Sequence, residues 1–320
     1  MDPFEAQTKE WFAYLPPLTR PADLDAFWEE ARAQSRAAPL AATRAKVAFP
    51  CRGVDVYDLT YEGLDRTVVH GWLLVPALFG RGPFPCLVHY HGLGGDRGRP
   101  ADFLPWILLG AAVVSVDCRD QGGLTGSAGA WSSGSMGQFH VRGILNPREA
   151  YLRSLYTDAL RAIDVACRQP EIDPARLVVE GGSQGGGMAM AMVALDPRPI
   201  LALADVPTYS NLTERVLTGA GGFASVADYL KRYPEHTERC LTTLSYFDTM
   251  NFADRIRASV YASVGGRDPV CPAKCFFATY NRVTSPKAVE IYPFNGHEGG
   301  GSRHFERKLV RLRDALAANP

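Results

Sequence analysis

Hydrophobic and polar positions follow two different patterns along this chain, and the change comes near residue 82. From Asp23 to Arg36, apolar residues recur at helical spacing and acidic residues crowd the first turn, where the helix dipole favours them. Segments 54–63 and 68–76 instead alternate apolar with polar residues around a short polar turn, which predicts an antiparallel strand pair near a sheet edge. We therefore interpret residues 1–80 as an N-terminal extension with an edge hairpin.

After Gly82 the chain changes to short, continuous apolar runs, which are typical of parallel strands buried on both faces. The predicted strands cover residues 86–92, 111–118, 176–182, 200–206, 259–265 and 288–294. The helical segments that separate several of them are Tyr151–Arg168, Gln184–Leu195, Pro272–Asn281 and Arg303–Ala318. This alternation predicts an α/β fold with a mostly parallel, doubly wound sheet flanked by helices, and such sheets bind ligands at the carboxyl ends of their strands.

Two stretches interrupt the alternation, Gly122–Gly143 and Thr208–Met250, and both are expected to be insertions over the sheet. The first is rich in glycine and serine and too poor in periodic apolar residues to be a simple crossover. We therefore expect an ordered loop with a binding or assembly role. No repeat or linker divides the chain, so we predict a single domain over residues 1–320.

Composition excludes some partners without choosing a function. Because 34 basic residues balance 34 acidic ones, net charge gives no reason to expect nucleic acid or an anionic membrane surface as partner. No apolar run approaches the roughly 18 residues of a membrane-spanning helix. The N-terminal residues also lack the basic and then apolar pattern of an export signal. We expect a soluble, cytoplasmic protein that binds neither nucleic acid nor membrane.

The seven cysteines form an odd, scattered set, which predicts reduced thiols rather than a disulfide framework. Cys271 and Cys275 are the one close pair, but their spacing is unusual for zinc and no second cysteine or histidine pair accompanies them. We expect no metal site.

The strongest chemical signal is the sequence Gly181-Gly182-Ser183-Gln184-Gly185, a G-x-S-x-G pattern between a predicted strand and a predicted helix. A sharp turn between strand and helix needs small neighbours if its serine is to adopt a strained backbone and expose its hydroxyl. The structural alternative is a serine that merely caps the helix. Since strand, turn and helix are in register, we predict that Ser183 is a nucleophile.

A serine hydroxyl near neutral pH needs a base, and the base needs a partner that orients it. Asp268 follows the predicted strand 259–265, and His297 follows the predicted strand 288–294, in the chain order serine, acid, histidine. The other histidines considered lie in the final helix, the early hairpin or the insertions. We predict His297 as general base and Asp268 as its orienting acid, although each could be an ordinary loop residue.

Ester hydrolysis also needs backbone N–H donors for the oxyanion of the tetrahedral intermediate. Gln184 supplies one donor. The sequence His91-Gly92-Leu93-Gly94-Gly95 resembles the oxyanion loops of lipases and esterases, so we predict the Leu93 N–H as the second donor, with Gly92 as the alternative.

With these motifs in place, the chain resembles carbohydrate esterase family seven, the acetylxylan esterases and cephalosporin C deacetylases of the α/β-hydrolase superfamily. The segments that carry the resemblance are Phe27–Glu29, Gly71–Pro76, Arg142–Arg148, Gly181–Gly187, Asp205–Pro207, Leu244–Asp248 and His297–Gly301. The resemblance covers nearly the whole chain.

The resemblance implies a cytoplasmic serine esterase that removes acetyl groups from acetylated xylo-oligosaccharides and cephalosporin C without metal or organic cofactor. It further implies a homohexamer, a trimer of dimers, in which an inserted loop at about residues 122–147 contributes to the subunit interface. Gly92 and Pro207 are the predicted pocket residues, and Glu298 in the His297 motif is a predicted structural support.

Two positions depart from the family pattern. The family motif Arg-Gly-Gln is Arg119-Asp120-Gln121 here, and Leu93 stands where tyrosine is frequent. We expect Arg119 and Gln121 to brace the site through buried hydrogen bonds or ion pairs. The open alternatives are a hydrolase that prefers longer acyl esters, thioesters or peptides, and a noncatalytic binding protein with the same fold.

Overall fold

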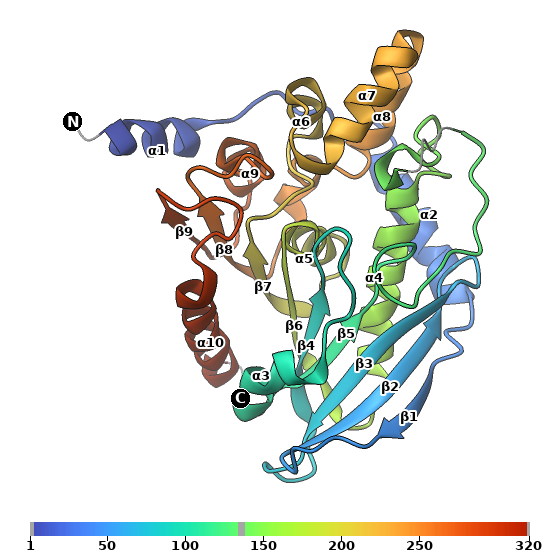
Figure 1. Ribbon diagram of the computed structural model, residues 1–320, viewed down its shortest axis with the longest axis vertical. Helices are drawn as coiled ribbons and strands as arrows, with labels where there is room; N and C mark the ends of the chain where they lie inside the picture. The colour runs from blue at the N-terminus through green and yellow to red at the C-terminus, as the bar shows by residue number, and fades with distance from the viewer. Residues whose placement is uncertain (1–2, 134–137, 319–320) are drawn as a thin grey trace.

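The computed structural model describes residues 3–133 and 138–318, and within them a nine-stranded sheet has the order β1-β2-β3-β5-β4-β6-β7-β8-β9 (Figure 1). The strands are β1 Thr43–Val47, β2 Val54–Glu62, β3 Val68–Pro76, β4 Phe84–Tyr90, β5 Ala112–Val116, β6 Ile172–Gly182, β7 Pro199–Asp205, β8 Ser259–Gly265 and β9 Lys287–Tyr292. The helices are α1 Pro3–Ala13, α2 Leu24–Ala37, α3 Leu104–Leu108, α4 Tyr151–Cys167, α5 Gln184–Leu195, α6 Leu212–Thr218, α7 Ala224–Arg232, α8 Thr237–Ser245, α9 Ala273–Tyr280 and α10 Gly301–Ala318.

The sheet combines an antiparallel edge with a parallel body. Strands β1, β2, β3 and β5 pair antiparallel, whereas β5, β4, β6, β7, β8 and β9 pair parallel. The predicted edge hairpin and parallel strands are therefore confirmed. Strand β1 was missed because its residues are almost all exposed and carry no apolar alternation.

Helices cover both faces of the sheet, with α2, α4 and α5 on one face and α3 and α10 on the other (Figure 1). Successive residues of the central strands point to opposite faces, so each strand contributes to two separate cores. The core on the α4 and α5 face includes Val88, Val114, Val179 and Ala202, and the core on the α3 and α10 face includes Leu87, Val113, Val178 and Leu203. Burial on both faces explains why these strands have continuous apolar sequences.

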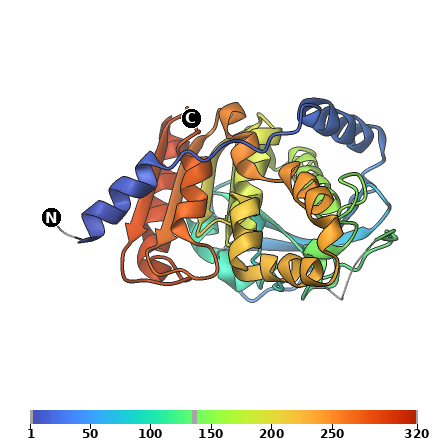
Figure 2. The ribbon, with the colours of Figure 1, turned by 90° about the horizontal axis from the view of Figure 1, so that it is seen from above.

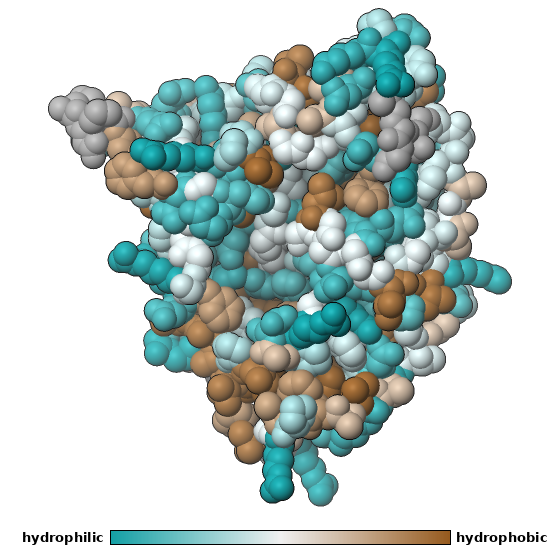
Figure 3. Space-filling view, in the orientation of Figure 1, coloured by the Kyte–Doolittle hydropathy of each residue, from teal (hydrophilic) through white to brown (hydrophobic). Residues whose placement is uncertain are grey.

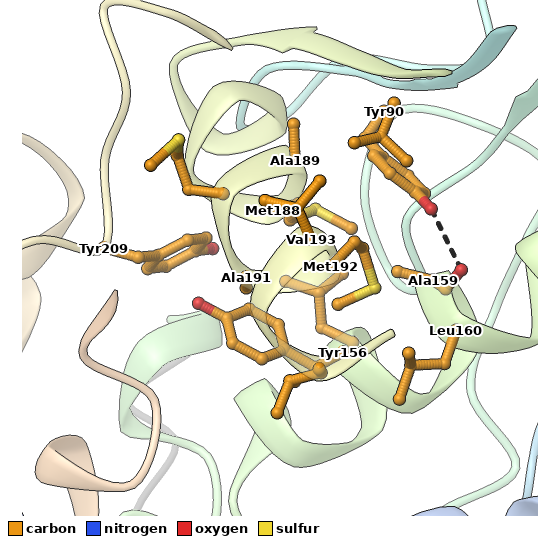
Figure 4. Packing of buried hydrophobic residues seen from close by; sticks show 14 of the residues in the cluster. Tyr90, Tyr156, Ala159, Leu160, Met188, Ala189, Ala191, Met192, Val193 and Tyr209 are labelled. Carbon is orange, nitrogen blue, oxygen red and sulfur yellow. Dashed lines mark hydrogen bonds between the residues drawn. The ribbon is translucent and has the colours of Figure 1, made fainter. Parts of the chain in front are cut away.

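Helix α5 is buried on all sides, which its sequence of methionine, alanine and glycine predicts because no polar face is present. Tyr90, Tyr156 and Tyr209 surround it, and the Tyr90 hydroxyl donates a hydrogen bond to the Ala159 carbonyl of α4 (Figure 4). These rings enclose the helix, and the Tyr90 hydrogen bond ties β4 to α4.

The Thr208–Met250 segment forms α6, α7 and α8 at the end of the molecule where the parallel strands finish (Figure 1). In the other predicted insertion, residues 134–137 lie outside the described residues. The described part of residues 122–147 contains a single short turn of 3₁₀ helix, at Phe139–Val141. Apart from that turn, the described part of this loop contains no helix or strand.

The chain between α1 and α2 runs along one side of the molecule (Figure 2). It is held by hydrogen bonds such as that from the Thr19 amide to Asn251 Oδ1, 3.1 Å long. On the face in Figure 3, apolar surface gathers around α3, where Leu108 is 65% exposed. Across residues 3–133 and 138–318, no helix combines the length and apolarity needed to cross a membrane.

Candidate active site

Ser183 lies in the sharp turn between β6 and α5, with φ 57° and ψ −115°. A non-glycine residue in this region is strained by about 1–3 kcal/mol, and such strain persists only when the surroundings impose it. The Ser183 amide donates to the Asp205 carbonyl at 2.8 Å, and the amides of Gly187 and Thr208 donate to the Ser183 carbonyl. These hydrogen bonds hold the turn from both sides.

The glycines on either side of the turn are required by close backbone contact. A Cβ on Gly181 would lie 2.4 Å from the Tyr90 carbonyl oxygen, and a Cβ on Gly185 would lie 1.8 Å from the same atom. No side chain fits at these distances. The G-x-S-x-G pattern is thus set by the packing of the turn against the end of β4.

Ser183, His297 and Asp268 form a continuous hydrogen-bonded chain at the carboxyl ends of β6, β8 and β9. The Ser183 Oγ to His297 Nε2 distance is 2.9 Å, and the His297 Nδ1 to Asp268 Oδ2 distance is 2.8 Å. The Asp268 carboxylate is fully buried, while the His297 side chain is 33% exposed. The carboxylate favours the tautomer with hydrogen on Nδ1, which leaves Nε2 free to accept the serine proton.

The two loops that carry the acid and the histidine are themselves fixed. Asp268 Oδ1 accepts hydrogen bonds from the amides of Val270 and Cys271, at 2.8 and 2.9 Å. On the histidine loop, Glu298 Oε2 accepts from the Gly296 amide at 3.0 Å. Glu298 therefore contacts the backbone of the loop and supports the position of His297, without touching the serine.

The loop after β4 lies beside the serine turn. A Cβ on Gly92 would lie 3.9 Å from Ser183 Cβ, so Gly92 brings the backbone of this loop against the serine turn. Gln184 is the first residue of α5, a position whose amide has no acceptor inside the helix. Among the described residues, the amides of Leu93 and Gln184 have no hydrogen-bond acceptor, so both can donate to a ligand.

Gln121 links this loop to the serine turn. Its Oε1 accepts from the Gly94 amide at 2.8 Å, and its Nε2 donates to the Tyr151 hydroxyl at 2.8 Å. The side-chain amides of Gln121 and Gln184 also exchange two hydrogen bonds, of 3.0 and 3.1 Å. These hydrogen bonds connect the loop after β4, the serine turn and α4.

Arg119 is buried and donates to two carboxylates, Asp158 and Asp65. Burial alone would raise the pKa of Asp65, but the Arg119 guanidinium lowers it to about 2. None of these hydrogen bonds reaches Ser183, His297 or Asp268. Its place is in the support behind the site, tying α4 to the turn after β2.

Asp120, the departure from the family motif, has φ 56°, a left-handed conformation that glycine adopts freely and aspartate tolerates. Its Oδ2 accepts from Arg142 Nη1 at 2.5 Å. The loop conformation is therefore one that suits glycine, and the substitution adds an ion pair to the 122–147 loop.

A small cavity of about 40 Å³ adjoins Ser183. Its walls are Leu93, His140, Ser183, Gln184, Thr208, Tyr209, Arg215, Gly222, Phe223, Val270 and Cys271. The predicted pocket residues Gly92 and Pro207 are not among the residues that line it. Their chain neighbours Leu93 and Thr208 take these places.

Sequence reasoning missed the far wall of the cavity. His140, Arg215 and Phe223 come from parts of the two insertions that no motif and no strand pattern cover. The one available signal was that insertions at the carboxyl ends of strands frequently complete a site. Which residues of an insertion face the nucleophile depends on tertiary packing.

Asp268, Cys271 and His297 bring possible metal-ligand atoms within 4.8 Å of one another. Their polar atoms already have other partners, however. Both His297 nitrogens and both Asp268 oxygens are hydrogen-bonded, and Arg215 Nη1 donates to Cys271 Sγ at 3.5 Å. A cation would have to displace these contacts and lie beside a guanidinium, so the donor set suits proton transfer better than metal binding.

Comparisons with known proteins show which family the chain belongs to. Residues 1–315 match the acetyl xylan esterase (AXE1) family. The acetyl esterase Axe7A of Xylanibacter ruminicola is 27% identical over 306 residues, which are 92% of this chain and 68% of that protein. The acetyl xylan esterase from Paenibacillus sp. R4 is 37% identical with a TM-score of 0.92, covering 96% of this chain and 98% of the other.

A second solved structure, acetyl xylan esterase 1 from Thermoanaerobacterium sp. JW/SL YS485, is 27% identical with a TM-score of 0.89, again covering 96% and 98% of the two chains. The predicted α/β-hydrolase fold and the predicted family are confirmed. The chain belongs to the acetyl xylan esterase (AXE1) family and is a carboxylic ester hydrolase.

Proposed function

We propose that this protein is a serine esterase that removes acetyl groups from acetylated xylo-oligosaccharides and cephalosporin C. The observation that carries the proposal is the hydrogen-bonded chain from Ser183 through His297 to Asp268. His297 takes the Ser183 proton as the hydroxyl attacks the acetyl carbonyl, and the amides of Leu93 and Gln184 stabilise the oxyanion.

The alcohol then leaves with the proton from His297, and an acetyl group remains on Ser183. Water, activated by the same histidine, hydrolyses this acetyl-enzyme and restores the serine. These steps use no metal ion or organic cofactor. Gln121, Glu298 and Arg119 act only by holding the loops that carry the reacting groups.

The size of the cavity supports an acetyl substrate. At about 40 Å³, the cavity has room for a short acyl group and not for a long acyl chain. The names of the matching family and relatives, acetyl xylan esterase and acetyl esterase, support the same acyl group. The rival is an esterase for other short acyl chains.

The first experiment measures acetate release from acetylated xylo-oligosaccharides and from cephalosporin C by the native chain and by Ser183→Ala. Release by the native chain alone supports both the chemistry and the nucleophile. If the enzyme cleaves 4-nitrophenyl acetate but neither acetylated xylo-oligosaccharides nor cephalosporin C, the proposed roles of Ser183, His297 and Asp268 stand and the proposed substrates are wrong. A preference for the octanoate ester over the acetate would overturn the deacetylase assignment.

We also propose a cytoplasmic homohexamer, a trimer of dimers, built from single-domain subunits with residues 122–147 at a subunit interface. Exposed apolar side chains such as Phe12, Leu15 and Leu18 support association, because large apolar side chains on the surface favour contact with another chain. Size-exclusion chromatography with light scattering tests the assembly, and a monomer peak would overturn it.

A further inference from the structure

Arg215, from α6 in the Thr208–Met250 insertion, lines the cavity beside Ser183 and is 1% exposed. Its Nη2 donates to the Val270 carbonyl at 2.7 Å, and its Nη1 donates to Cys271 Sγ at 3.5 Å. The guanidinium also lies over the Phe223 ring, 5.2 Å from its centre. Its Nε is buried and has no hydrogen-bond partner among the described residues.

The charge of Arg215 has no paired carboxylate in the part of the chain that the structure describes. The acid that its charge affects is Asp248, but the Asp248 oxygens already accept from the amides of Asn211, Leu212 and Met250. An arginine is always charged, and a buried charge that lacks a counter-ion destabilises the folded state. An anion in the cavity would offset that cost.

No other lining residue of the cavity carries a permanent charge. His140, the second basic group there, has its pKa lowered to about 4, chiefly by burial and in part by the nearby Arg215 charge. It is therefore neutral at neutral pH. Its ring stacks on Phe223 with a centroid separation of 4.5 Å, which places it on the same wall as the guanidinium.

We propose that Arg215 makes this cavity a subsite for a carboxylate on the substrate, so that the enzyme prefers esters that carry an acidic group close to the scissile bond. The inference rests on the proposed esterase function and deepens it by naming a substrate class. A carboxylate in the cavity would lie beside the guanidinium, whose charge no carboxylate of the described residues neutralises. The resulting ion pair forms in a buried site, where charges attract one another more strongly than in water.

The carboxylate can belong to the acyl group or to the alcohol, and matched pairs of esters distinguish the two. Monoethyl malonate against ethyl butyrate tests the acyl side, and acetoxyacetate against acetoxyacetamide tests the alcohol side. In a pH-stat, each hydrolysis consumes one water and gives one acid and one alcohol. The quantity compared is kcat/KM for the acidic ester over its neutral partner.

We expect the native enzyme to prefer the acidic ester in one of the two pairs. Arg215→Met should lower kcat/KM for that ester about 30-fold or more, since it removes one partner of a buried charge pair. The neutral esters should change by less than about 3-fold. Arg215→Lys should recover part of the preference. Arg267→Met is the matched control, because it removes an exposed cation beside Asp268 that does not line the cavity.

If Arg215→Met lowers kcat/KM equally for acidic and neutral esters, the proposal is overturned and Arg215 only holds the Val270–Cys271 turn. Absence of any preference in the native enzyme would also overturn it, while leaving the esterase function intact. If no ester is hydrolysed, the proposed function fails, and calorimetry decides the subsite. In that case malonate or acetoxyacetate should bind the native chain and Arg215→Lys but not Arg215→Met, and equal binding by all three would contradict the proposal.

Discussion

Two regions of the site, one at the strand ends and one in the insertions, differ in how far the sequence predicts them. The catalytic edge, comprising Ser183, Asp268, His297 and the 92–94 loop, lies on turns that directly follow strands. The inserted wall, comprising His140, Arg215 and Phe223, comes from segments with no strand pattern. The edge holds atoms at fixed distances by backbone hydrogen bonds, whereas the wall presents side chains that shape the space.

The catalytic edge and the inserted wall are expected to control different properties, the rate on all esters and the preference among esters. Changes at the catalytic edge should slow every ester alike, because the same groups act on every carbonyl. Changes at the inserted wall should alter which ester is preferred. A wall variant that slows all esters equally, or an edge variant that changes only preference, would break this division.

The largest effect is expected for Asp268→Asn. The asparagine keeps the shape but reverses the tautomer that His297 needs, so kcat should fall about 10³- to 10⁴-fold on acetate, butyrate and acidic esters alike. Initial rates on the ester series measure this, with thermal unfolding as the control for folding. A loss confined to one ester would contradict the assignment.

The next effect concerns the ion cluster beneath the catalytic edge. Lys308 of α10 is buried and lies 2.6 Å from Glu180 Oε1 of β6 and 2.5 Å from Asp205 Oδ2 of β7. Lys308→Met leaves two carboxylates without their cation and should lower the free energy of unfolding by about 3–5 kcal/mol. Urea denaturation measures the change, and Lys231→Met on an exposed pair is the matched control.

The same cluster predicts acid sensitivity. Burial alone would raise the pKa of Glu180, but Lys308 and His89 lower it to about 2. Because the folded pKa lies below the ordinary value of 4.5, the stabilisation is complete above pH 4.5 and is lost as the pH falls toward 2. Between pH 4.5 and pH 2, the free energy of unfolding should fall more steeply with pH for the native chain than for Glu180→Gln. Equal slopes would exclude Glu180 as the source of the acid sensitivity.

Gln121→Ala should reduce kcat about 10- to 100-fold on every ester, because the 92–94 loop and the serine turn lose their mutual brace and the oxyanion donors move. The measurement is kcat on the same ester series. Gln169→Ala, distant from the site, is the control. An unchanged kcat would show that the loop keeps its position without the brace.

Phe223→Ala, at the inserted wall, should raise the rate on butyrate relative to acetate about 10-fold by enlarging the cavity. The same substitution removes a buried ring and should cost about 3–5 kcal/mol of stability. Competition between the two esters below the unfolding temperature measures the ratio. An unchanged ratio would mean that the acyl group does not reach this wall.

The smallest effect is expected for Asp120→Gly. Glycine relieves the left-handed strain at φ 56° but loses the pair with Arg142, so the free energy of unfolding should change by no more than about 1 kcal/mol. Thermal unfolding and activity both test this. A large loss of activity would give Asp120 a role in the site itself.

By itself, the sequence determined the fold and the positions of the candidate triad. Continuous apolar runs identify buried parallel strands, and the glycines around Ser183 identify the turn because no other residue fits against Tyr90. Asp268 and His297 could be chosen because parallel strands bring their following loops to one edge. These patterns are local, so a single sequence displays them.

Only the tertiary structure decided what surrounds the triad. Arg215 of α6 donates to the Val270 carbonyl although α6 and the turn after β8 share no sequence pattern, and Trp28 of α2 donates to the Tyr246 carbonyl after α8. The tertiary structure alone also shows the exposed strand β1. It likewise shows that Leu93 and Thr208 line the cavity and that Gly92 and Pro207 do not. Such contacts depend on how distant segments pack, and packing between distant segments leaves no periodicity in either of them.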